Sequence, residues 1–206
     1  MAITYPLSTP TEIGIASIEL SVTNAVAVSR SPFTFSQQVH SYAGQMWSAS
    51  VSVPPLRKEY IEPWVAFLVS LKGQAGTFLL GDPNNVTPRG VATGTPLVKG
   101  ADQTGETLEI DGATISTTGW LKAGDYIQLG TASSATLHKV LVDADSDGSG
   151  NVTLEIWPGI RTAPADNAAV TVNDCKGVFR LSSNQQSWSI NESSAYGLQF
   201  DAMEAI

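Results

Sequence analysis

The sequence predicts a mostly β protein, in which a β-sandwich with one helix is interrupted by an inserted small β-barrel, OB-like or similar. Two observations support this prediction. Apolar residues alternate with polar residues over many short stretches, and this period of two is typical of strands with one buried face. Only one stretch, residues 57–73, has the three- and four-residue apolar spacing of a convincing helix.

The other elements are expected to pack around residues 47–80. A strand is predicted where four apolar residues alternate with serines: Trp47, Ala49, Val51 and Val53. The helix follows, and its apolar face consists of Ile61, Trp64, Leu68 and Leu71. We expect regular helix to start close to Pro63, with residues 57–62 as an irregular lead-in, because an interior proline removes a backbone donor. Lys72 and Gly73 end the helix, and residues 76–80 form a short apolar strand.

The segment before this unit is expected to be extended. Residues 1–10 hold two prolines and predict a turn-rich arm. Residues 13–28, beginning at Ile13, are rich in β-branched side chains and predict one or two strands with a break near Asn24. Phe33 and Phe35 are expected on one side of an extended segment, and Gly44 at a turn into the Trp47 strand.

The composition changes after residue 85. Residues 86–105 predict a connector with little periodicity, and residues 107–112 a strand that ends in an Asp-Gly turn. Further short strands are expected at residues 126–129, 136–142, 152–157 and 169–172, with residues 143–151 as a hairpin loop. Five short strands separated by turn signals favour a small barrel.

Three alternating stretches close the chain, at residues 178–181, 187–190 and 196–200. Three strands need a partner to bury their apolar face. The sequence therefore predicts one β-sandwich domain made of residues 1–85 and 174–206, into which residues 86–173 are inserted as the second domain.

Composition limits the classes of function. The chain has 206 residues, 42% hydrophobic residues and a formal net charge of -8, which argues against a nucleic-acid-binding surface. The single cysteine, Cys175, excludes an internal disulfide. There is no secretory signal and no apolar run of membrane-spanning length, so we expect a soluble protein folded inside a cell.

The most conspicuous motif is the run that contains Asp143, Asp145 and Asp147, because it matches the start of an EF-hand calcium loop. The match then fails, since position twelve is Leu154 and strands flank the loop. We interpret it as a polar loop, and the sequence leaves calcium binding open.

No other residue combination predicts catalysis, a cofactor or a metal site. His40 and His138 have no serine or acidic neighbour at a telling spacing. Glu59 and Glu62 suit the positive end of the helix dipole, and Cys175 is expected to be a small, semi-buried thiol. The aromatic residues of the insert are expected in its core or rim, although they could also stack on a sugar: Trp120, Tyr126 and Trp157.

Several phrases resemble the distal tail proteins of long-tailed, siphovirus-type bacteriophages. They are residues 5–7, residues 33–39 with Trp47, the helix over residues 64–73, and residues 76–83. In the insert, residues 121–128 and Trp157-Pro158 look like the small barrel of similar phage proteins.

The resemblance implies a tail-tube-like sandwich that forms a ring, usually of six copies, at the tail tip of the virion. Such a ring joins the tail tube to the hub protein and to the tail fibres or receptor-binding proteins, and DNA passes through its lumen. Three alternatives stay open: a carbohydrate-binding module using Trp120 or Trp157, a tail-associated hydrolase using Asp143 and Asp145, and a tail-tube protein.

Overall fold

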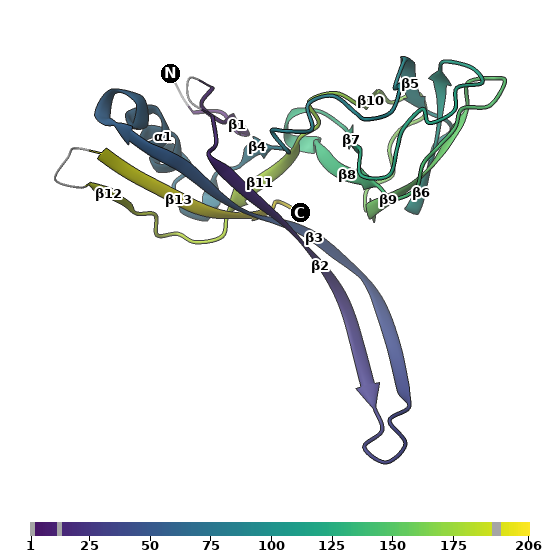
Figure 1. Cartoon of the computed structure of the whole chain (residues 1–206), viewed down its shortest axis with the longest axis horizontal. Coiled ribbons are helices and arrows are strands. Elements are labelled where there is room, and N and C mark those ends of the chain that lie inside the picture. Colours follow the sequence, from purple (N-terminus) through teal and green to yellow (C-terminus); the bar gives the residue numbers. More distant parts are fainter. Residues whose placement is uncertain (1–2, 12–13, 191–194) are drawn as a thin grey trace.

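The computed structural model describes residues 3–11, 14–190 and 195–206. It confirms a mostly β fold, since strands hold 48% of the residues and helices 10%. Two sheets lie next to each other, and a long two-stranded hairpin projects away from both (Figure 1). Ile13, which was assigned to a strand from the sequence, lies outside the described residues.

The first sheet combines strands from both ends of the chain. Its strand order is β1 (Leu7–Ser8), β4 (Phe78–Leu80), β11 (Gly177–Leu181), β13 (Ala195–Glu204), β3 (Gln37–Arg57) and β2 (Ser17–Arg30), with β12 (Trp188–Ile190) also paired to β13. The β1–β4 pair is parallel and the other pairs are antiparallel. The alternation predicted around Trp47 is confirmed, because the apolar residues of that stretch are buried and the serines between them are not.

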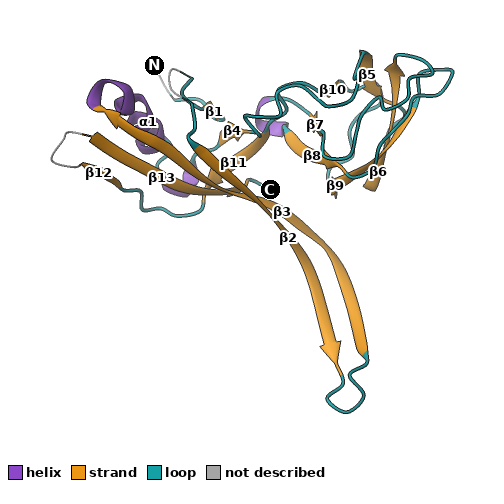
Figure 2. Ribbon diagram, in the orientation of Figure 1, coloured by secondary structure: helices purple, strands orange, loops and turns teal. Residues whose placement is uncertain are grey.

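The second sheet is antiparallel, barrel-like and nearly closed. Its strand order is β10 (Val170–Thr171), β7 (Tyr126–Leu129), β8 (Thr136–Val140), β9 (Val152–Ile160), β6 (Gly105–Ala113) and β5 (Gly94–Val98). A bridge between Leu97 and Ala169 brings the two ends of the sheet together. Figure 2 shows how much loop connects these short strands.

Two expectations for the second sheet were wrong. The connector after residue 85 contains a strand, β5, which has only two fully buried side chains and therefore little periodicity to detect. The Asp111-Gly112 pair lies inside β6 rather than at a turn. Gly112 has a φ of 73° there, and a Cβ at this position would clash with the backbone oxygen of Thr95 on the neighbouring strand β5.

Helix α1 spans Lys58–Ser70, and it begins five residues before the expected start at Pro63. Pro63 is accommodated inside the helix, at the cost of one backbone hydrogen bond to the carbonyl of Glu59. The buried face is the predicted one, and it packs over the first sheet through Trp64 and Phe67, whose rings contact Phe200. Burial of this face outweighs the local penalty of the proline.

Short 3-10 turns follow the helix at Gly73–Ala75 (η1) and precede β8 at Ala132–Ser134 (η2). Lys72 itself adopts the left-handed conformation, with a φ of 53°, and so ends the helix together with Gly73.

Strands β2 and β3 form one hairpin that is much longer than predicted. The break expected near Asn24 is only a register shift, after which β2 continues to Arg30. Gly44 lies inside β3 within the same irregularity, and not at a turn. A Cβ at Gly44 would lie 2.9 Å from the Cβ of Ala25 on the opposite strand. Phe33 and Phe35 lie in the turn of this hairpin instead of in an extended segment.

The two sheets are packed together at the base of the hairpin. Trp47 of β3 makes an edge-to-face contact with Trp157 of β9, with ring centroids 4.7 Å apart. The indole Nε1 of Trp47 also donates to the backbone oxygen of Leu137 in β8, at 2.9 Å. The domain boundaries at residues 85/86 and 173/174 stay a prediction, but the strands on either side of them contribute to a shared core through Tyr126 and Leu137.

Candidate functional site

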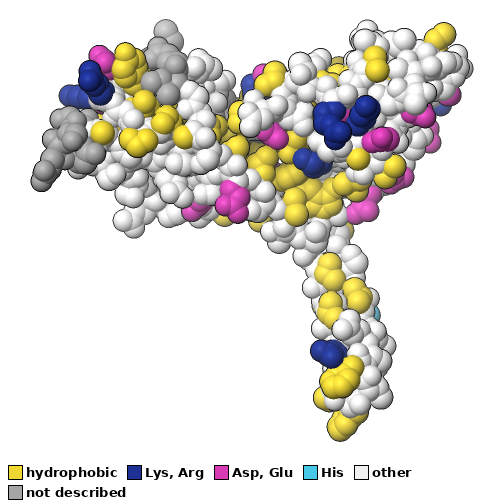
Figure 3. Space-filling view, in the orientation of Figure 1, with side chains coloured by type: hydrophobic (Ala, Val, Ile, Leu, Met, Phe, Trp, Pro, Cys, Tyr) yellow, Lys and Arg dark blue, Asp and Glu magenta, His cyan; other side chains and the backbone are white. Residues whose placement is uncertain are grey.

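The most unusual feature of the molecule is the outer part of the long hairpin, residues 25–44, which we call the arm. It contacts neither of the two hydrophobic cores. From Asn24 to Arg30 the strand advances about 20 Å, at about 3.3 Å per residue. Figure 3 shows the arm standing free of the body, with apolar side chains along its length and at its tip.

The two faces of the arm differ in chemistry. Directly opposed residues of an antiparallel pair share a face, so the Val28–Val39 pair lies on one face together with Val26. All three valines are exposed. The opposite face carries the Ala27–His40 pair and polar residues beyond it. The arm therefore has an apolar face that nothing in the described chain covers.

The tip of the arm is an ordered turn. The backbone N–H of Ser31 donates to the oxygen of Ser36 at 2.9 Å, and the N–H of Phe35 donates to the oxygen of Ser31 at 3.0 Å. Phe33 is 91% exposed and Phe35 is 63% exposed. The guanidinium of Arg30 lies 4.5 Å from the centre of the Phe35 ring. The turn thus presents two aromatic rings and one positive charge to solvent.

The base of the arm is held by the second sheet. The Oδ1 of Asn24 accepts a hydrogen bond from the indole of Trp157 at 2.7 Å. The side-chain oxygen of Gln45 accepts one from the N–H of Gly159 at 2.6 Å, and its amide donates to Glu106 at 2.7 Å. These contacts fix the direction in which the arm leaves the body. Sequence reasoning missed them, because each joins residues more than sixty positions apart.

A buried ion pair lies next to the same base. Arg161 binds Glu204 through two nitrogens, at 2.7 and 2.8 Å, and Glu204 is almost fully buried. The Oε2 of Glu204 also accepts a hydrogen bond from the backbone N–H of Trp47, at 3.1 Å. The carboxylate is thus fully paired, and it ties the last strand of the first sheet to the end of β9.

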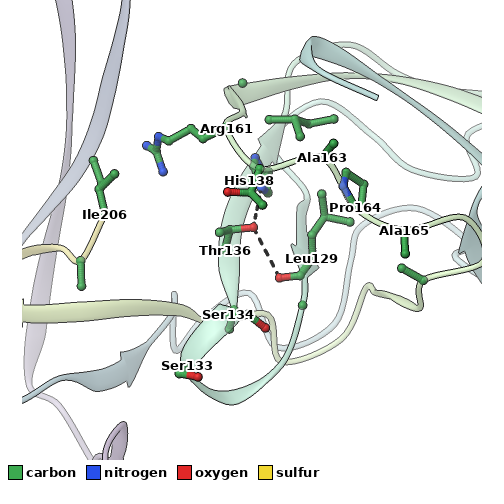
Figure 4. A pocket seen from close by; sticks show the side chains of 17 residues that line it. Leu129, Ser133, Ser134, Thr136, His138, Arg161, Ala163, Pro164, Ala165 and Ile206 are labelled. Atoms are coloured by element: carbon green, nitrogen blue, oxygen red, sulfur yellow. Dashed lines mark hydrogen bonds between the residues drawn. The ribbon is translucent and has the colours of Figure 1, made fainter. Parts of the chain in front are cut away.

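A hollow of about 410 Å³ opens beside this ion pair. It lies between the turn joining β7 and β8, the segment of residues 159–168 and the C-terminal Ile206 (Figure 4). Its walls are mostly small or apolar and include Leu129, Ala135, Ile160, Ala163, Pro164 and Ala165. The hollow is therefore suited to an apolar group.

His138 lines this hollow but is itself buried. Its Nδ1 lies 2.6 Å from the oxygen of Pro158, which can only accept, so Nδ1 carries the proton. Its Nε2 lies 2.9 Å from the hydroxyl of Thr136 (Figure 4). Burial lowers the pKa of His138, which outweighs the opposite effects of the Pro158 carbonyl and the Glu204 charge. With both ring nitrogens engaged, His138 is a structural residue, and His40 lies exposed on the arm far from it.

The three aspartates of residues 143–147 do not converge on one point. Asp143 accepts from the N–H of Ala123 and Asp145 from that of Gly119, at 2.8 and 2.6 Å. Asp147 accepts from Asn151, whose hydrogen bonds hold the pKa of that carboxyl below its usual range. These bonds fasten the loop to its surroundings, as expected for a polar loop. Among the described residues no group of three or more His, Cys, Asp or Glu could hold a metal ion.

Two of the three aromatic residues of the insert, Trp120 and Tyr126, are buried and therefore not free to stack on a sugar. Trp120 is fully buried, and its Nε1 donates to the oxygen of Thr93. Tyr126 is buried beneath the ammonium of Lys139. Trp157 is half-buried, and its ring packs on Trp47. The expectation of core packing is confirmed for Trp120 and Tyr126.

The remaining sequence candidates have structural surroundings. Cys175 is buried, and burial raises the pKa of its thiol to about 12, so it is a poor nucleophile. Glu59 and Glu62 lie exposed near the start of α1. No helix in the described part of the chain is long and apolar enough to cross a membrane.

No family model and no curated protein matches this sequence. The candidate functional surface therefore consists of the exposed apolar arm, the hydrogen-bonded residues at its base and the apolar hollow beside that base.

Proposed function

We propose that this chain is a structural virion protein that assembles into a ring at the distal end of a phage tail. In that position it joins the tail tube to the hub and to the host-adsorption apparatus, and its lumen passes DNA. The role is mechanical, and the arm is the part that holds neighbouring subunits together.

The observation that carries the proposal is the uncovered arm. A two-stranded hairpin standing alone in water is marginally stable at best. This one exposes Val26, Val28 and Val39 on one face and two phenylalanines at its tip. Contiguous exposed apolar surface of this kind marks a protein–protein contact. An arm that gains its cover only from another subunit supports an assembling protein over a monomeric binding module.

The edge of the first sheet supports the same proposal. Strand β2 is the last strand of that sheet, and among the described residues it pairs only with β3. Its fourteen residues contain no proline and only two charged side chains, Glu19 and Arg30. An unprotected edge of this length is a template for pairing with another chain. If this edge in every subunit contacts a different surface of its neighbour, the contact is head-to-tail. Such contacts generate a closed ring when the rotation between neighbouring subunits is right.

The charge of the chain suits a wall that DNA slides past. The net charge of -8 disfavours binding of phosphates, whose affinity for proteins comes mainly from lysine and arginine contacts. We propose that the second sheet, which packs through Trp157 of β9 beside the base of the arm, makes the contacts to fibres or adsorption proteins outside the ring.

Light scattering together with negative-stain microscopy of the purified protein tests this function. We expect a closed ring with a central hole wide enough for duplex DNA. Tubes of indefinite length would assign the chain to the tail tube instead. A protein that stays monomeric up to millimolar concentration, and also when mixed with tail-tube and hub proteins, would contradict the proposal.

A further inference from the structure

The tip of the arm and the hollow at its base have complementary properties. The tip offers Phe33 and Phe35 in a turn that is already ordered by its own hydrogen bonds. Because the turn is formed before binding, little conformational entropy is lost when the rings are buried. The hollow of about 410 Å³ is lined mainly by small apolar residues and has the size of a pocket for a small organic group.

The tip of a chain cannot fill the hollow of the same chain. Gly159 and Arg161 line the hollow, and both bind Gln45 at the base of the arm. The tip lies at the opposite end, more than about 20 Å further along the strands. Figure 1 shows the arm pointing away from the body along its whole length. Any tip that reaches this hollow must belong to another molecule.

We infer that the hollow formed by the β7–β8 turn, residues 159–168 and Ile206 receives the Phe33–Phe35 tip of a second copy of this chain. This inference rests on the self-assembly proposed above, and it names the surfaces that meet. The contact joins two different patches, so it is head-to-tail and either closes a ring or continues as a stack.

Charge favours a second copy as the owner of the inserted tip. The arm carries a single charged residue, Arg30, so with -8 for the whole chain the remainder has a net charge of -9. Two copies repel each other over most of their surfaces, whereas the arm approaches an acidic body without repulsion.

The available area agrees with this assignment. The arm has three exposed aromatic residues, Phe33, Phe35 and Tyr42. Complete burial of a fully exposed aromatic side chain removes about 150–250 Å² from water, and Phe35 and Tyr42 are already more than one-third covered. Together with the exposed valines they approach the roughly 800 Å² per partner of a standard interface. The tip alone would be a minor contact, but the tip and the arm behind it make a full one.

Cysteine cross-linking tests the contact directly. Phe33→Cys and Ala165→Cys are prepared as separate proteins, mixed in equal amounts and treated with a short bismaleimide. We expect a covalent dimer in the mixture and none in either protein alone, and a ladder of higher species from the double variant. The unaltered protein is the control, since Cys175 is buried and its thiol has a pKa of about 12.

Substitutions supply an independent measurement. Phe33→Ala with Phe35→Ala, or Ala163→Trp to fill the hollow, should each weaken self-association about tenfold or more. The combined variant should be no weaker than either alone, because both remove one contact. Ile115→Ala is the matched control, since Ile115 is an exposed apolar residue remote from the arm and the hollow, and it should leave association unchanged.

The outcomes separate this inference from the proposed function. Rings that form normally, but show cross-links only between two Phe33→Cys subunits or none at all, would overturn the inference and leave the ring intact. Absence of both rings and cross-links would overturn both. A mixed cross-link in tubes rather than rings would support the contact and reassign the assembly.

Discussion

At the scale of single residues, buried polar side chains determine how the two sheets meet. Glu204 is buried and finds Arg161 and the N–H of Trp47 as partners. His138 is buried and finds Thr136 and Pro158. Each of these groups would be costly to bury alone, so each favours the one arrangement in which its partner is in reach.

Removing Arg161 should destabilise the protein strongly. Arg161→Ala leaves the Glu204 carboxylate buried without its cation, and this is expected to lower the free energy of unfolding by about 3 kcal/mol. Urea denaturation measures it. Glu204→Gln added to Arg161→Ala should recover part of the loss, because a neutral amide still accepts from Trp47. A double variant that is less stable than Arg161→Ala alone would contradict this account.

The stability of the protein should depend on pH through His138. Burial lowers the pKa of His138 in the folded state below its usual value of 6.5, so the unfolded chain binds the proton more readily. The stability that neutral, buried His138 contributes to the folded state is fully present above pH 6.5. It is lost as the pH falls towards the pKa of His138 in the folded state. We expect the Tm to fall between pH 7.5 and 5.5, and the fall to be smaller in His138→Gln. His40→Gln is the control and should keep the full dependence, and equal slopes in all three proteins would contradict the prediction.

At the scale of elements, the hairpin and the helix show opposite relations between local sequence and packing. The arm obeys local β preferences with no core behind it, since its valines and aromatics are strand formers that remain exposed. Helix α1 breaks a local rule at Pro63 and is rescued by its buried face.

Shortening the arm should separate assembly from folding. Replacing residues 25–44 by Asn-Gly joins Asn24 to Gln45 with a two-residue turn suited to hairpins. The free energy of unfolding should change by less than about 1 kcal/mol, because no arm residue belongs to either core. Self-association should be lost, as measured by light scattering. A shortened protein that assembles as before would show that the arm is not the contact.

Replacing the proline in the helix should raise stability. Pro63→Ala restores an N–H donor to the carbonyl of Glu59 and removes the steric clash of the ring. Part of the gain is offset by the greater freedom of the unfolded chain, so we expect a net increase of about 1 kcal/mol. Thermal unfolding measures this, with the exposed helix position Glu62→Ala as the control. A lower Tm for Pro63→Ala would mean that the proline fits a bend that the packing requires.

At the scale of the whole molecule, charge and apolar surface are distributed unevenly. The arm is nearly uncharged and apolar on one face, whereas the body carries the acidic excess. Association of identical acidic bodies is therefore opposed by long-range repulsion and driven by short-range burial.

Salt should strengthen self-association. At about 0.5 M salt the Debye length falls well below the roughly 10 Å of 0.1 M, which screens the repulsion between copies of net charge -8. We expect the assembled fraction to rise between 20 mM and 500 mM sodium chloride, measured by sedimentation. Dissociation by salt would indicate that ion pairs, and not the apolar arm, hold the copies together.

The sequence by itself determined the elements with a strong period and a core behind them. The alternation at Trp47, Ala49, Val51 and Val53 and the spacing from Ile61 to Leu71 correctly predicted a buried strand face and a buried helix face. The mostly β class followed from the same periods. These features can be detected locally, because the side chains on one buried face recur every second residue in a strand and every three to four residues in a helix.

Only the tertiary structure determined where the arm, the hydrogen bonds of Asn24 and Gln45 at its base, and the hollow lie. Strand β2 passes Asn24 and β3 passes Gly44 without a turn, because pairing between the two strands outweighs local break signals. The Gln45–Gly159 and Arg161–Glu204 contacts join distant parts of the chain, and no spacing in the sequence predicts them. Phe33 and Phe35 could be noticed from the sequence, but their place at the free end of a hairpin depends on the register of the strands behind them.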